Sequence, residues 1–242
     1  MNNYIENTLP NAQGLRTSEV SHLTGLSEAD VAAVQSAWGA AELSAAVNRP
    51  EEGGHITRFV MYERIRQFFT THDARGSVLE VGGAYGAIHS MFPREHIDYT
   101  PTDAPNVDVH DLPFADSTFD YVICDQVIEH VRNPFVAVEE MHRVLKSGGW
   151  LILATCFHVP VHKRGDNPTD YWRFTLDGLR ELVRDFTNVY QCEGWGNREA
   201  ISIIHFGGPY RFTPVQGRSQ LERIVTYNEP DVPISVWVIA QK

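Results

Sequence analysis

Short apolar segments that alternate with helical segments are the feature that most constrains the fold of this chain. The helical segments include residues 134–145 and 176–186, which carry apolar side chains at helical spacing. Seven short apolar segments are expected to be strands: residues 78–81, 97–100, 107–109, 119–124, 150–155, 188–193 and 235–240. Strands that alternate with helices imply crossover connections and a mostly parallel sheet covered on both faces. The pattern therefore predicts an α/β protein with a doubly wound sheet.

The first 54 residues have a different pattern, without a convincing strand. Residues 27–30 resemble a capping box, and residues 29–47 then have the spacing of a helix. A break at residues 48–54 separates this helix from a second one at residues 56–69. We therefore expect an N-terminal helical cap or lid over residues 1–54, followed by one α/β domain over residues 55–242.

Composition excludes several classes of protein. The 242 residues have a net charge of −11, which repels phosphate backbones, so we expect no nucleic-acid partner. The polar start resembles no signal peptide, and the lack of a long apolar run argues against a membrane partner. The three cysteines are far apart, so neither a disulfide framework nor a zinc site is indicated, and a cytoplasmic location with reduced thiols is expected.

A glycine-rich loop follows the first predicted strand. Residues 80–86 contain Gly82, Gly83 and Gly86, which let the backbone turn sharply and approach a ligand closely. Asp103 follows about twenty residues later, where an acid accepts hydrogen bonds from ribose hydroxyls. These features argue for a nucleoside-bearing cofactor, but they do not separate S-adenosylmethionine (SAM) from a nicotinamide dinucleotide.

Four ordered motifs favour SAM. They are Leu112-Pro113-Phe114, Phe119-Asp120, Glu129-His130-Val131 and Arg143-Val144-Leu145-Lys146-Ser147-Gly148-Gly149. In this order and spacing, residues 76–190 resemble the class I SAM-dependent methyltransferases, most closely the "type 11" branch. The resemblance implies SAM as cofactor and a Rossmann-like seven-stranded sheet of order 3-2-1-4-5-7-6, with the last strand antiparallel.

The resemblance also implies the positions that bind the cofactor. Glu80 would orient the loop near the methionine moiety, Asp103 would hold the ribose, and Asp108 with Val109 would contact adenine. Asp125 and Gln126 would face the methyl end. The full implied set is Glu80, Gly82, Gly83, Ala84, Gly86, Asp103, Asp108, Val109, Asp125 and Gln126, and Ala84 stands where the family usually has a glycine.

The acceptor side is expected around residues 157–175, because ligands of open α/β sheets bind beyond the carboxyl ends of the strands. His158 and His162 are candidate general bases. Candidate acceptor-binding residues are His55, Arg58, His130, Tyr171, Trp172 and Arg173. An alternative interpretation gives this segment a structural role, with Asp170 paired to Arg173 and Thr175 capping a helix. We expect no metal, although His158, His162, Asp166 and Asp170 leave that interpretation open.

The leading functional hypothesis is methyl transfer from SAM to a small polar acceptor, such as a sugar or a glycosylated metabolite, with O- favoured over N-methylation. A non-catalytic SAM-fold binding module is the first alternative. An NAD(P)-dependent oxidoreductase is the second, and Ala84 and Ala87 argue against it because they replace two glycines of the dinucleotide fingerprint. The aromatic residues of segment 194–230 leave open an acceptor pocket or a homodimer contact: Phe206, Tyr210, Phe212 and Tyr227.

Overall fold

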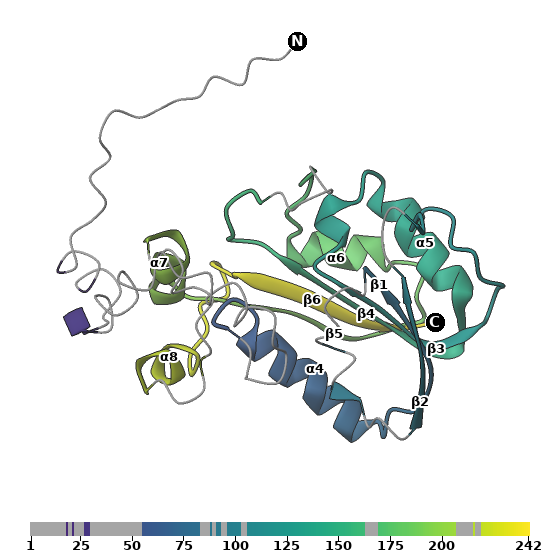
Figure 1. Ribbon diagram of the computed structural model, residues 1–242, viewed down its shortest axis with the longest axis horizontal. Helices are drawn as coiled ribbons and strands as arrows, with labels where there is room; N and C mark the ends of the chain where they lie inside the picture. Colours follow the sequence, from purple (N-terminus) through teal and green to yellow (C-terminus); the bar gives the residue numbers. More distant parts are fainter. Residues whose placement is uncertain are drawn as a thin grey trace, which may run out of the picture.

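A six-stranded sheet forms the centre of the part of the chain that the computed structural model describes (Figure 1). That part comprises residues 18, 21, 27–29, 55–82, 88, 91–92, 96–102, 106–162, 169–206, 215 and 219–242. The strands are β1 (Gly76–Val81), β2 (Ile97–Thr102), β3 (Phe119–Asp125), β4 (Leu145–Cys156), β5 (Asn188–Trp195) and β6 (Ser235–Gln241). Their order across the sheet is β2-β1-β3-β4-β6-β5.

Parallel pairing dominates one half of the sheet. β1 pairs in parallel with β2 and β3, and β3 pairs in parallel with β4. β6 lies between β4 and β5 and is antiparallel to both. The mixed α/β Rossmann-like architecture predicted from the alternating segments is therefore confirmed, with an antiparallel strand last in the chain.

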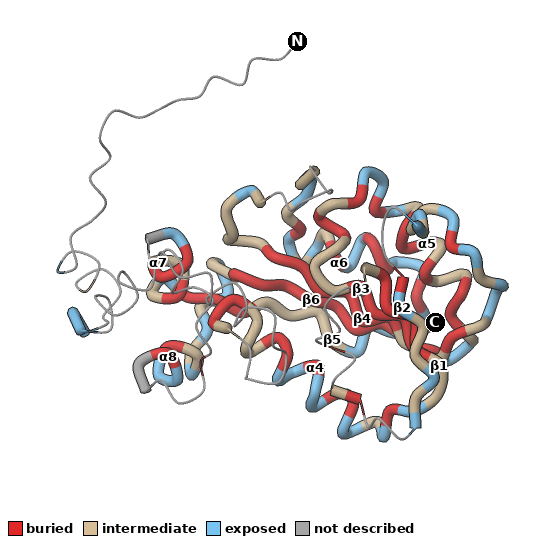
Figure 2. The backbone as a smooth tube through the Cα atoms, viewed as in Figure 1, coloured by how far each residue is buried: buried red, intermediate tan, exposed pale blue. Residues whose placement is uncertain are grey.

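Helices cover both faces of this sheet (Figures 1 and 2). Helix α4 (Phe59–Thr71) packs on one face, while α5 (Pro134–Val144) and α6 (Leu176–Leu182) pack on the other. Successive side chains of β3 alternate between these layers: Tyr121 and Ile123 belong to the α4 core, and Val122 and Cys124 to the opposite core. Because both faces are buried, the strands are almost continuously apolar.

Helix α5 shows how local sequence sets the boundaries. The Asn133 side chain accepts a hydrogen bond from the Val136 N–H, and Pro134 occupies the first turn, as is typical of a helix start. At the other end, Lys242 Nζ donates to the carbonyls of His142, Arg143 and Leu145. The helix ends at Val144, one residue before the predicted end at residue 145, and Gly148 and Gly149 lie in an irregular first part of β4.

The third predicted strand, at residues 107–109, is wrong. These residues form a turn in which Asp108 Oδ1 accepts from the His110 N–H and the Asp108 carbonyl accepts from the Asp111 N–H. A side-chain oxygen that satisfies a nearby backbone N–H competes with strand pairing. The described residues therefore form a sheet of six strands instead of the predicted seven.

Two helices that the periodicity did not predict follow β5. They are α7 (Arg198–Phe206) and α8 (Ser219–Ile224), and both contribute to the core that contains α4. Buried Asn197 connects them, since its Oδ1 accepts from the Ala200 N–H and its Nδ2 donates to the carbonyls of Ile224 and Tyr227. Of the aromatic residues of this segment, Tyr210 and Phe212 lie outside the described residues.

The predicted cap over residues 1–54 lies outside the described residues except at Ser18, Ser21 and residues 27–29. Within the described ranges, none of the helices has the length and apolar character needed to cross a bilayer.

Candidate active site

The carboxyl ends of β1, β3 and β4 meet at one edge of the sheet, and each carries polar side chains. Parallel pairing aligns Val81 with Cys124, so the loops that follow β1 and β3 leave the sheet side by side. Glu80 is the penultimate residue of β1, Asp125 is the last residue of β3, and Thr155 is the penultimate residue of β4. This is the edge at which open α/β sheets bind their ligands.

Glu80 is buried at this edge. Its Oε2 accepts a hydrogen bond from the Tyr99 hydroxyl at 2.6 Å. Burial raises the pKa of Glu80 to about 7, although the Tyr99 hydrogen bond opposes the shift. The carboxyl therefore titrates near neutral pH, and a cationic group beside it would stabilise its ionised form.

Gly82 begins the glycine loop in a conformation that suits only glycine. Its φ is +71°, and a Cβ at this position would lie 2.3 Å from Val127 Cγ2. Gly82 therefore lies directly against Val127, two residues beyond the end of β3. The other predicted loop residues, Gly83, Ala84 and Gly86, lie outside the described residues.

Asp125 and Gln126 provide polar atoms that the described chain leaves without partners. Asp125 Oδ2 accepts from the Tyr62 hydroxyl at 2.6 Å, and Arg58 donates to that hydroxyl at 3.2 Å. Asp125 Oδ1 and Gln126 Nε2 are buried without a hydrogen bond of good geometry to the described residues. Burial raises the pKa of Asp125, although the Gln126 side chain is close enough to that carboxyl to oppose the shift. Gln126 also has a φ of +56°, a strained value of the kind that concentrates at functional sites.

These groups fit the methionine end of SAM. A buried acceptor and a buried donor that lack partners cost free energy unless a ligand satisfies them. The ammonium of the cofactor suits Asp125 Oδ1, its carboxylate suits the Gln126 amide, and its sulfonium suits an acidic edge. Glu80, Asp125 and Gln126 therefore form a set with the right chemistry beside the loop that begins at Gly82.

The residues predicted to contact adenine and ribose, Asp108, Val109 and Asp103, give less evidence for a cofactor site. Asp108 has a side chain that is 69% exposed and pairs with the His110 ring at 2.6 Å. The backbone hydrogen bond from His110 lowers the pKa of Asp108. Val109 packs against the core that contains α5. Asp103 lies outside the described residues.

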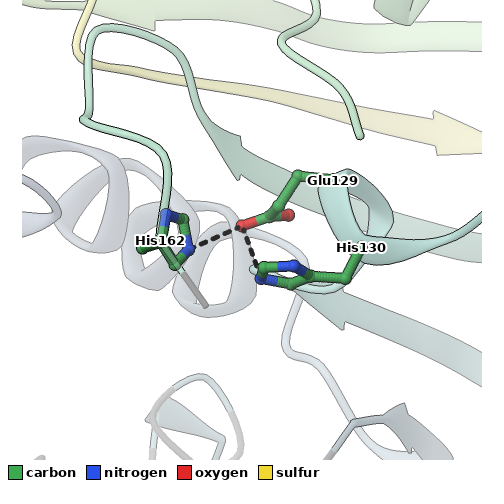
Figure 3. Close-up of side chains that lie close together, drawn as sticks. All are labelled: Glu129, His130 and His162. Atoms are coloured by element: carbon green, nitrogen blue, oxygen red, sulfur yellow. Dashed lines mark ion pairs between the residues drawn. The ribbon is translucent and has the colours of Figure 1, made fainter. Parts of the chain in front are cut away.

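Glu129 is the centre of a second cluster, in the 3₁₀ helix η5 (Ile128–His130) (Figure 3). Its side chain is fully buried, and its Oε2 accepts from the Thr155 hydroxyl at 2.8 Å. Its Oε1 lies 3.9 Å from Nε2 of His130 and 3.9 Å from Nε2 of His162. The two imidazole rings are 5.0 Å apart and nearly perpendicular.

The two predicted bases occupy different surroundings. Burial lowers the pKa of both His158 and His162. His162 joins Glu129 and His130, whereas the charged neighbour of His158 is His205 on α7. The structure thus brings His130 and His162 together and does not bring His158 to them.

The segment after β4 is held to the rest of the fold by hydrogen bonds. The Asp170 carboxylate, whose side chain is fully buried, accepts from Arg173 at 2.5 and 2.8 Å and from the His162 N–H at 2.8 Å. The backbone N–H groups of Tyr171 and Trp172 both donate to the Glu129 carbonyl.

The predicted acceptor-binding residues therefore differ in availability. Tyr171 and Trp172 are 46% and 40% exposed, although Trp172 Nε1 donates to the Val131 carbonyl. Arg173 is paired with Asp170, and Thr175 caps α6 by accepting from the Gly178 N–H. His55 lies 2.5 Å from the Thr57 hydroxyl through its Nδ1, before the start of α4.

Glu129, Tyr62 and Tyr99 are site residues that the sequence reasoning did not assign. Glu129 belongs to the Glu129-His130-Val131 motif, so a buried acid in a 3₁₀ turn could have been suspected there. Tyr62 and Tyr99 contact Asp125 and Glu80 only through tertiary structure, 63 and 19 residues apart in the sequence.

Comparison with known proteins supports the family. A methyltransferase-domain family model matches residues 92–153. A probable S-adenosylmethionine-dependent methyltransferase of Mycolicibacterium smegmatis is 26% identical over 143 residues, which is 59% of this chain and 54% of that protein. The demethylmenaquinone methyltransferase of Staphylococcus carnosus is 40% identical over 89 residues, 35% of each chain.

The chain is therefore similar to a methyltransferase domain over residues 92–153, and to S-adenosylmethionine-dependent methyltransferases over part of its length. The chain spans about half the length of the first of those relatives and about a third of the second. Among solved structures, the match to the [4+2]-cyclase SpnF covers 95% of this chain and 97% of that one, with a TM-score of 0.51 and 16% identity. At that identity the likeness concerns the fold alone.

Proposed function

We propose that this chain is a SAM-dependent methyltransferase, which transfers the methyl group of SAM to a hydroxyl of a small polar acceptor, such as a sugar or a glycosylated metabolite. The acceptor oxygen forms a bond to the methyl carbon while the carbon–sulfur bond breaks. The electron pair of the broken carbon–sulfur bond stays on sulfur, which yields S-adenosylhomocysteine. The acceptor hydroxyl loses its proton. Because the sulfonium is already activated, the main task of the protein is to position the acceptor.

The observation that carries the proposal is the pair of unpartnered buried atoms, Asp125 Oδ1 and Gln126 Nε2. They lie at the end of β3, close in sequence to Val127, which Gly82 contacts. The family resemblance assigns the methionine end of SAM to these same positions. Glu80, Gly83, Ala84, Gly86, Asp103, Asp108 and Val109 complete the proposed cofactor site.

The Glu129 cluster supports an acceptor site beside the methyl group. Arg58 interacts electrostatically with both Asp125 and Glu129, so the two groups belong to one polar edge. We propose that His162, rather than His158, faces the acceptor, and that Tyr171 and Trp172 offer exposed aromatic surface to a ring. Residues 1–54 would then form a cap over a domain of residues 55–242.

Calorimetric titration with SAM and S-adenosylhomocysteine tests the cofactor site. We expect binding by the wild-type protein and loss of most of it in Asp125→Asn and Asp103→Ala. The control is Glu181→Gln, which neutralises an exposed acid on α6 and should bind normally. Wild-type protein that binds neither ligand would refute the proposal.

A second candidate function is cofactor binding without methyl transfer. The structural neighbour SpnF is named a [4+2]-cyclase, so this fold is not restricted to one reaction. A screen of hydroxylated acceptors with isotopically labelled SAM separates the two. Labelled product supports methyl transfer, whereas tight SAM binding without product from any acceptor supports the alternative.

A further inference from the structure

We propose that Glu129, His130 and His162 bind a divalent transition-metal ion, for which Zn²⁺ is the ion to test. One ligand atom from each residue, Glu129 Oε1 and the Nε2 atoms of the two histidines, lies within 4.8 Å of the other two. Figure 3 shows both imidazole rings directed at the same carboxylate. Two histidines and one carboxylate form a ligand set that zinc and ferrous iron use in proteins.

Hydrogen bonds on the far side of His130 fix its tautomer. His130 Nδ1 lies 2.5 Å from the Thr169 carbonyl oxygen. A carbonyl oxygen only accepts, so Nδ1 carries the proton and Nε2 of the neutral ring keeps its lone pair. A backbone acceptor behind a histidine is the usual arrangement at metal sites, because it orients the ring toward the ion.

His162 has the same arrangement. Its Nδ1 lies 3.3 Å from the Pro160 carbonyl and 3.5 Å from Asp170 Oδ2, and both of these oxygens are acceptors. Asp170 is itself fixed by Arg173 and by the His162 N–H. The lone pair of His162 Nε2 therefore also points toward Glu129.

The charge of Glu129 gives a second, independent argument. Its side chain is fully buried, and the groups within ion-pair distance of it in the described ranges are His130 and His162, while Arg58 and Arg173 act on it from farther away. A buried carboxylate is costly unless a cation compensates it. Because Thr155 occupies Oε2 and the Cys156 thiol is a weak donor at 3.7 Å, Oε1 can bind an ion between the two rings.

The distances require a small closure around the ion. Ligand atoms of tetrahedral zinc, with bonds of about 2.0–2.1 Å, are roughly 3.3 Å apart, compared with 3.9 Å from Glu129 Oε1 to each Nε2 and an upper bound of 4.8 Å for the three ligand atoms. Rotation of the side-chain torsions supplies this change. Three protein ligands leave one position for a water or a hydroxyl oxygen, as at catalytic rather than structural zinc sites.

The sequence led us to expect no metal, and the one metal interpretation it left open used His158, His162, Asp166 and Asp170. The site proposed here is a different one. It excludes His158 and depends on Glu129 instead. If the proposed methyl transfer is correct, an acceptor hydroxyl on the open position would have a lowered pKa, and its proton would leave to solvent. His162 would then act through the metal. Metal binding itself does not depend on that reaction.

The test is stoichiometric metal binding by the full chain, freed of any affinity tag and of metal. We expect one Zn²⁺ per chain by elemental mass spectrometry after desalting, and competition with a chromophoric chelator gives the Kd. Co²⁺ in place of Zn²⁺ should produce the strong visible absorption bands that are typical of four-coordinate Co²⁺. His162→Ala and His130→Ala should weaken Zn²⁺ binding by at least about tenfold.

Two further variants protect the test against misfolding. Glu129→Gln keeps the buried shape while it removes the charge, and it should also lose Zn²⁺. His96→Ala changes an exposed histidine elsewhere and should bind Zn²⁺ as wild type does. Wild-type protein that retains no Zn²⁺, or a His162→Ala variant that binds it normally, would overturn the metal site.

SAM titration of the same samples keeps this inference apart from the proposed function. Zn²⁺ binding without SAM binding would refute the proposed function and leave the metal site intact. SAM binding without Zn²⁺ binding would refute the metal site alone.

Discussion

At the residue scale, Gly82 combines two constraints that forbid a side chain. Its φ of +71° is strained for other residues, and a Cβ would collide with Val127 Cγ2. We predict that Gly82→Ala lowers the free energy of unfolding by about 1–3 kcal/mol and weakens SAM binding, because the loops after β1 and β3 must separate. Urea denaturation and calorimetry measure the two effects.

Gly148 provides the matched control. Its φ of +79° imposes a similar backbone strain, but an added Cβ would lie 4.0 Å from Gln241 Nε2, in ordinary contact. Gly148→Ala should therefore destabilise less and leave SAM affinity unchanged. Equal effects of the two substitutions on SAM binding would contradict the proposed role of Gly82.

Glu80 should make stability depend on pH. Burial raises its pKa from 4.5 to about 7 in the folded protein, so between these values the folded state holds a proton that the unfolded state has released. Stability should fall as pH rises through this window, by up to about 3 kcal/mol from Glu80 alone. Above pH 7 both states are ionised and the contribution no longer changes.

Comparison with Glu80→Gln isolates this effect from other titrating groups. Urea denaturation at about pH 5 and pH 8 should show a smaller loss of stability in the variant than in wild type, because glutamine does not titrate. Identical losses would show that Glu80 has an ordinary pKa in the folded protein.

Site residues differ in how far sequence alone could identify them. Glu80, Asp125 and Gln126 follow from strand ends and the family motifs, because their place is fixed by short-range sequence. Tyr62 and Tyr99 do not, because only the packing of α4 and β2 brings them to those acids. His158 and His162 look equivalent in sequence, and the turn between them sends their rings to different neighbours.

At the scale of elements, the segment after β4 is held by the pair of Asp170 and Arg173. Arg173→Met would leave a fully buried carboxylate without its main partner. We predict a loss of roughly 3 kcal/mol in the free energy of unfolding, since an uncompensated buried charge is strongly destabilising. Urea denaturation measures it.

A pair with the same spacing on α6 gives the control. Asp177 and Arg180 are also three residues apart, but their side chains are 94% and 52% exposed. Arg180→Met should therefore change stability by less than about 1 kcal/mol. If both substitutions cost equally little, Asp170 is not the anchor of this segment.

Elements whose pattern is local were predicted well, and those that depend on tertiary contacts were not. Strands β3, β4 and β6 are rich in apolar β-formers, and their prediction is confirmed. The turn at residues 107–109 looked like a strand because the hydrogen bonds of Asp108 are invisible to a pattern of apolar residues. Helices α7 and α8 depend on Asn197, a polar residue whose burial no periodicity indicates.

At the scale of the whole molecule, the two cores flank one sheet. The residues that form them, from Ile56 on one face and Leu79 on the other, all lie beyond position 54 within the described ranges. We predict that a variant beginning at residue 55 still unfolds in one cooperative transition by circular dichroism. A broad, non-cooperative transition would contradict the proposed division at residue 54.

The position of β6 has a consequence for how this molecule is made. Six of its seven residues are buried, and it lies between β4 and β5, although it follows both in the chain. Until it is inserted, β4 and β5 both have an unpaired edge, and the slot between them is lined by apolar groups. During translation this strand leaves the ribosome after the other described strands. The nascent chain therefore exposes the unpaired edges of β4 and β5, which favour aggregation, until synthesis of the sheet is nearly complete.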